Sequence, residues 1–96
     1  MEIRAGPGAG QIVPITRDSF VVGRSRECDL SLPSRHVSRR HALIQKSKGY
    51  YYIQDLGSTL GTWVNGQRIV QATLIHPGAI IALADVELVF QEARKH

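Results

Sequence analysis

Three polar segments of the chain carry side chains suited to binding an anion: residues 23–26, 34–41 and 57–62. Arg24 and Arg39 offer planar guanidinium forks, and Ser38 and Thr59 offer hydroxyl groups. The glycine-flanked turn at 57–61 can direct backbone N–H groups outward. Forks and hydroxyls together suit a phosphate dianion, because arginine binds it bidentately and charge-assisted hydrogen bonds are about twice as strong as neutral ones.

The same segments lack the groups that would transfer or hydrolyse a phosphate. Ser38, His41 and Asp55 are residue types of a hydrolase triad, but Ser38 and His41 lie only three residues apart. The chain also has no Gly-x-Ser-x-Gly nucleophile elbow. His36 and His41 do not have the spacing of a helical metal pair, and no third ligand is evident. We therefore predict a binding protein with no catalytic residue, no metal and no cofactor.

A glycine-rich stretch near the N-terminus is a further candidate site. Gly6, Gly8 and Gly10 have the spacing that opens a dinucleotide fingerprint. That fingerprint needs a following helix and a later acidic residue, whereas a strand-like run containing Pro14 follows here. We interpret the stretch as a hairpin loop.

The positive charge of the chain is concentrated. Residues 24–48 carry seven basic and two acidic side chains, a net charge of +5, whereas the whole chain carries +4. Such a field attracts anionic partners, nucleic acid included. Single-strand readers interleave aromatic residues for base stacking, and this stretch has none, although Tyr50, Tyr51 and Tyr52 follow directly. Nucleic-acid binding stays an alternative, as does the interpretation that these arginines are a solvated face.

The elements that must position these segments are short strands. Apolar runs of a few residues, of which residues 11–15 are one, indicate strands. Two-residue hairpin signals separate several of these runs, at 48–49, 65–66 and 84–85. Asn65-Gly66 is the strongest of these signals, because both residues tolerate positive φ. No window has a helical stripe. Ten or so closely spaced strands predict a β-sandwich or barrel, in which function lies on the loops at one end.

Length and composition set the remaining limits. Ninety-six residues with 43% hydrophobic and 21% charged side chains predict one globular domain over 1–96, with a polar tail at 91–96. The single Cys28 excludes an internal disulfide, which favours a reducing, cytoplasmic location. The chain has no apolar stretch of membrane-spanning length and no N-terminal secretory pattern.

Several short motifs, taken in order, resemble a forkhead-associated domain. They are Gly23-Arg24, Ser38-Arg39-Arg40-His41, Asp55-Leu56-Gly57-Ser58-Thr59, Gly61-Thr62 and Val64-Asn65-Gly66. Each motif alone is weak, but their order and spacing match from about the first strand to Phe90. The resemblance implies an all-β, eleven-stranded antiparallel sandwich of the SMAD/FHA-like type. It also implies a non-catalytic module that binds phosphothreonine-containing proteins in signalling, as a monomer or as part of a larger chain.

The resemblance also assigns roles to single residues. It implies that Arg24 clamps the phosphate, that Ser38 and Thr59 donate hydroxyl hydrogen bonds to it, and that Arg39 adds a second charge or a backbone contact. Four further positions are implied to contact the peptide or to support the loops: Ser58, Leu60, Asn65 and His41. Of these, His41 is implied to brace the loops, and Asn65 to tie loops together or to form a hairpin turn.

Leu60 departs from the family pattern, in which an asparagine binds the peptide main chain beside the phosphothreonine. Leucine cannot make that hydrogen bond, whose loss costs about 0.5–1.5 kcal/mol and more if peptide groups are left unpaired, so we expect roughly tenfold weaker binding. We therefore expect phosphate recognition with a weaker or altered grip on the peptide. The alternative is a docking scaffold that binds its partner independently of phosphate.

Overall fold

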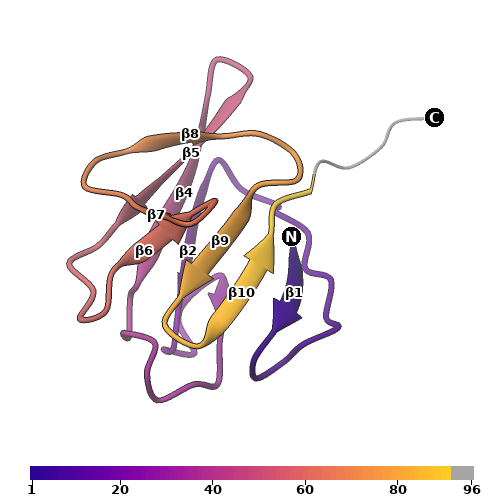
Figure 1. The fold of residues 1–96 in the computed structure, drawn as a ribbon. Coiled ribbons are helices and arrows are strands. Elements are labelled where there is room, and N and C mark those ends of the chain that lie inside the picture. Colours follow the sequence, from indigo (N-terminus) through magenta and orange to yellow (C-terminus); the bar gives the residue numbers. More distant parts are fainter. Residues whose placement is uncertain (92–96) are drawn as a thin grey trace.

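A computed structural model describes residues 1–91, so the tail predicted at 91–96 lies almost wholly outside the described residues. The fold is a sandwich of two five-stranded sheets (Figure 1). The first sheet contains, in spatial order, β1 (Glu2–Ala5), β10 (Val86–Val89), β9 (Ile80–Leu83), β6 (Thr62–Val64) and β7 (Gln67–Arg68). The second contains β3 (Leu30–Ser31), β2 (Ser19–Gly23), β4 (Ala42–Ser47), β5 (Tyr50–Asp55) and β8 (Thr73–Ile75).

The all-β sandwich predicted from the sequence is confirmed, with three differences of detail. The described residues form ten strands where the resemblance implied eleven. The pairing is antiparallel throughout except between β2 and β3, which run parallel. The run at 11–15, expected as a strand, makes a single bridge between Ile12 and Glu2. Pro14 within it has no N–H to continue a ladder.

In the part of the chain that the structure describes, no helix is long and apolar enough to cross a bilayer.

Two hairpin turns form because their central residues adopt positive φ. Lys48 and Gly49 have φ of 53° and 83°, and Asn65 and Gly66 have φ of 49° and 84°. Positive φ at both positions is the type I′ geometry that matches the twist of the flanking strands. These turns set the β4–β5 and β6–β7 registers, as the sequence signals predicted.

The core lies between the sheets and is built by alternation along the strands. Phe20 on β2, Ile44 on β4 and Ile53 on β5 lie side by side in register, and all three are buried. On the facing sheet, Ile81 and Leu88 pair across β9 and β10 and are also buried. Burial of large aliphatic and aromatic side chains supplies the main driving force for the fold.

Strand direction brings the polar segments to one end of the sandwich. Val22 near the end of β2 pairs with Ala42 at the start of β4, and Ala42 pairs with Asp55 at the end of β5. The loops that leave or enter these strands therefore share one end, which lies toward the bottom of Figure 1 together with the β9–β10 turn. Register, not sequence proximity, brings the three loops together.

Candidate functional site

The predicted phosphate ligands line one surface pocket. Arg24 comes from the β2–β3 loop, Ser38 and Arg39 from the β3–β4 loop, and Thr59 from the β5–β6 loop. The pocket has a volume of about 450 Å³, and four further residues complete its lining: Arg35, His36, Val37 and Leu60. None of the lining residues is acidic. Their function as phosphate ligands stays a prediction.

Main-chain hydrogen bonds join the first two loops. The Arg24 N–H donates to the Ser38 carbonyl oxygen at 3.0 Å, and the Ser25 N–H donates to the Arg39 carbonyl oxygen at 3.1 Å. The approach is so close that a Cβ atom on Gly23 would lie 2.2 Å from the Arg39 carbonyl oxygen. Only glycine fits there. Gly23 therefore allows the two loops to approach each other, while Arg24 lines the pocket.

Ser38 also joins the second loop to the third. Its Oγ accepts a hydrogen bond from the Thr59 N–H at 3.1 Å. Accepting this bond uses a lone pair and leaves the hydroxyl proton of Ser38 for another acceptor. Ser38 can therefore hold the Thr59 loop and donate into the pocket at the same time.

His41, directly before β4, forms hydrogen bonds at the ends of β2 and β5 and with two of the loops. Its ring is fully buried; Nδ1 accepts from the Ser38 N–H at 3.1 Å, and Nε2 donates to the Gly61 carbonyl oxygen at 2.7 Å. These partners fix the neutral tautomer with the proton on Nε2. The main chain of His41 also bonds Val22 and Leu56, on either side. A bracing residue would need contacts of this kind, and the bracing role of His41 stays a prediction.

The same contacts exclude a hydrolase triad of Ser38, His41 and Asp55. Both ring nitrogens of His41 are engaged by main-chain groups, so neither can take a proton from the Ser38 hydroxyl. A general base must reach the proton that it abstracts. Within residues 1–91, no group of three His, Cys, Asp or Glu side chains could hold a metal ion.

Asp55 organises the third loop. Its carboxylate accepts from the Ser58 N–H at 2.9 Å, from the Ser58 hydroxyl and from the Thr62 hydroxyl at 2.8 Å. Burial alone would raise the pKa of Asp55, but the hydrogen bonds from Ser58 and Thr62 outweigh it and hold that pKa below its ordinary value. Sequence reasoning missed this role, although Asp55, Gly57 and Ser58 are residue types that favour turns.

Ser58 and Asn65 support loops and do not line the pocket. The Ser58 Oγ, besides donating to Asp55, accepts from the Gly61 N–H at 2.9 Å, so its hydroxyl is used within the loop. Asn65 lies at the opposite end of β6, where its Oδ1 accepts from the Ile80 N–H at 2.9 Å. It forms a hairpin turn and ties that turn to β9, away from the predicted site.

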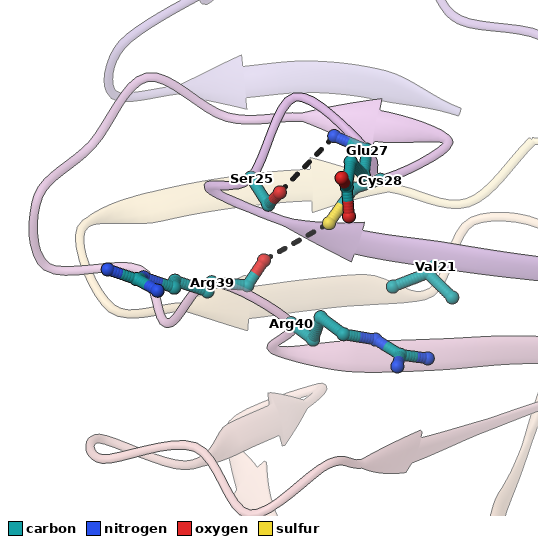
Figure 2. A pocket seen from close by; sticks show the side chains of 6 residues that line it. All are labelled: Val21, Ser25, Glu27, Cys28, Arg39 and Arg40. Carbon is teal, nitrogen blue, oxygen red and sulfur yellow. Dashed lines mark hydrogen bonds between the residues drawn. The ribbon is translucent and has the colours of Figure 1, made fainter.

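Arg39 lies between the first pocket and a second one of about 420 Å³ that contains Cys28 (Figure 2). The Cys28 thiol donates to the Arg39 carbonyl oxygen at 3.1 Å. Burial raises the pKa of this thiol, which keeps its proton on sulfur. Figure 2 shows the Arg39 guanidinium extending away from Cys28. The main chain of Arg39 is thus held while its charge is directed outward.

The arginines of the first pocket are not neutralised by neighbouring carboxylates. The ion pairs in the described part of the chain join Arg4 to Glu87 and Arg17 to Asp29, both outside the pocket. No carboxylate oxygen among residues 1–91 lies within ion-pair distance of Arg24 or of any other arginine lining it. The positive charge is therefore available to a bound anion.

Comparison with known proteins gives a consistent picture. The family model for the FHA domain matches residues 20–84. The chain is 32% identical over 88 residues to the glycogen accumulation regulator GarA of Mycolicibacterium smegmatis, a match that covers 92% of this chain and 55% of GarA. It is 33% identical over 90 residues to an ABC transporter ATP-binding/permease protein of Mycobacterium tuberculosis, covering 94% of this chain and 10% of the transporter. The chain therefore spans only part of these relatives.

Solved structures agree in fold. One from a study of phosphothreonine-dependent FHA domain interactions superimposes with a TM-score of 0.85 at 28% identity, covering 97% of this chain and 96% of the other. Mycobacterium tuberculosis EmbR in complex with a low affinity phosphopeptide superimposes with a TM-score of 0.84 at 35% identity, covering 91% of this chain and 23% of EmbR.

Proposed function

This chain is a member of the forkhead-associated (FHA) domain family, and on that premise we propose that its pocket captures a phosphorylated threonine of a partner protein. FHA domains are phosphothreonine-binding modules and not enzymes.

One observation carries the proposal: donors from three loops converge on one pocket that contains no acidic residue. The Arg24 fork provides charge and two parallel donors, and the Ser38 hydroxyl and the Thr59 side chain provide directional hydrogen bonds. A phosphate offers three strong acceptor oxygens and a charge of about −1.5 to −2. The number of donors and the sign of the charge fit this ligand.

Binding proceeds without covalent change. The net positive charge of residues 24–48 steers the phosphorylated segment toward the loops. Arg24 and Arg39 then neutralise the dianion, and Ser38 and Thr59 fix its orientation. Because hydrogen bonds already hold the loops together, little ordering cost remains at the moment of binding.

The consequence for the cell is a protein–protein interaction that depends on phosphorylation. GarA is a regulator of glycogen accumulation, and EmbR is a transcriptional regulatory protein. By analogy, the partner of this domain is a phosphothreonine-containing protein of a signalling pathway. A cytoplasmic location, expected from the single cysteine, stays a prediction.

Calorimetric titration tests the proposal. A set of threonine peptides is compared in phosphorylated and unphosphorylated form, and only the phosphorylated peptides are expected to bind. Arg24→Ala is expected to remove most of this affinity. Arg26→Ala is the matched control, because Arg26 lies on the same loop but does not line the pocket. Equal affinity for both forms of every peptide, or an unchanged affinity of Arg24→Ala, would refute the proposal.

A further inference from the structure

An apolar side chain lies among the polar groups of the pocket. Leu60 lines it together with Arg24, Ser38 and Thr59, yet 49% of its surface is exposed. Single exposed leucines are ordinary on protein surfaces. This one differs because it borders the predicted phosphate site directly.

Leu60 is held in place by its neighbours. The Gly61 N–H donates to Ser58 Oγ at 2.9 Å, which fixes the main chain just after Leu60. Gly61 has a φ of 84°, and a Cβ atom there would lie 2.6 Å from Arg68 Nε, so the turn is also packed from the side of β7. The position of Leu60 is thus set by the loop before any ligand binds.

A second exposed apolar residue lies beside the same loop. Trp63, on the outward face of β6, is 39% exposed. Its Nε1 lies 3.5 Å from the Leu60 carbonyl oxygen, which is long for a hydrogen bond but shows that the indole turns back toward the loop. We call Leu60 and Trp63 the apolar patch.

The location of the patch identifies what covers it. A chain whose phosphate lies against Arg24 and Ser38 passes Leu60, because that residue lines the same pocket. The side chain of leucine has no donor or acceptor for the main chain of that ligand, so it can act only on side chains. An apolar side chain placed against it removes apolar surface of both partners from water.

Resting on the proposed function, we propose that Leu60, supported by Trp63, is a specificity-determining residue that selects an apolar side chain next to the phosphothreonine of the partner. Phosphothreonine segments with a neighbouring leucine, isoleucine, valine or methionine bind in preference to those with polar neighbours. Covering the exposed half of one leucine corresponds to an affinity ratio of about three- to tenfold.

The test is a positional scan with calorimetry. In phosphothreonine peptides, each of the positions flanking the phosphothreonine is occupied in turn by leucine or by asparagine. One position is expected to favour leucine by about three- to tenfold. Leu60→Asn is expected to reduce that ratio to near one, and Leu60→Met to retain it. The ratio is the readout, because an asparagine at position 60 can also bind the peptide main chain and change the affinity for all peptides alike.

Val70→Asn is the control variant, since Val70 is 93% exposed and does not line this pocket; it is expected to leave the ratio unchanged. Phosphate-dependent binding with no preference for leucine at any position, or a preference that survives in Leu60→Asn, overturns the inference and leaves the proposed function standing. Binding that does not depend on phosphate overturns both.

Discussion

Ser38→Ala is the substitution that most sharply separates binding from stability. The Ser38 hydroxyl has two tasks: its oxygen accepts from the Thr59 N–H at 3.1 Å, and its proton is proposed to go to the phosphate. The first task lies at an exposed site, where water can replace the lost acceptor. The second involves a dianion in a pocket of positive charge.

The two tasks differ in expected magnitude. Loss of the bond to the Thr59 N–H is expected to lower the free energy of unfolding by about 0.5–1.5 kcal/mol. Loss of a hydrogen bond to a charged group is expected to cost about 1.5–3 kcal/mol of binding free energy. At about 1.4 kcal/mol for each factor of ten, the affinity for a phosphothreonine peptide falls by roughly 10- to 150-fold.

The assay is calorimetric titration of the phosphopeptide, combined with urea unfolding followed by circular dichroism. Ser25→Ala is the matched control, because the Ser25 hydroxyl also accepts one loop N–H, from Glu27 at 3.2 Å, and Ser25 does not line the predicted site. Both variants are expected to lose similar, small amounts of stability. If Ser38→Ala binds within twofold of the parent, or if both variants lose affinity equally, the assignment of Ser38 to the phosphate is wrong.

Three further predictions concern the support of the site and its pH dependence. His41→Ala leaves a cavity and removes the partners of the Ser38 N–H and the Gly61 carbonyl, so urea unfolding is expected to show a loss of about 3 kcal/mol; a loss below about 1 kcal/mol would contradict the bracing role. Because the folded-state pKa of Asp55 is lowered, its stabilising contribution is complete above the unfolded value of about 4 and is lost as the pH falls through the folded pKa. Asp55→Asn is therefore expected to be less stable than the parent at pH 7, with a difference that shrinks toward about pH 3 in pH-dependent unfolding; a difference that grows there would reverse the argument. Phosphopeptide affinity is expected to fall as the pH drops through about 6, where the phosphate loses its second charge, whereas titration at constant ionic strength showing no change would count against recognition of the dianion.

Features that depend on a few neighbouring residues could be predicted from the sequence. Asn65-Gly66 and Lys48-Gly49 predict tight turns because their backbone preferences are local, and both form with positive φ. The short, closely spaced apolar runs predict strands and a β-sandwich or barrel, and the resemblance to FHA domains favours the sandwich. The motif order that resembles FHA domains led to the family itself, which the match over residues 20–84 confirms.

The arrangement of the site was decided only by the tertiary structure. Ser38 and Thr59 are 21 residues apart, and their hydrogen bond exists because the β2, β4 and β5 registers bring two loops to the same end. In the same way, the Asn65 side chain meets the Ile80 N–H, 15 residues away, because β6 pairs with β9. Sequence patterns report local backbone preference and the side that a residue faces, whereas which loops meet depends on pairing between residues far apart in the chain.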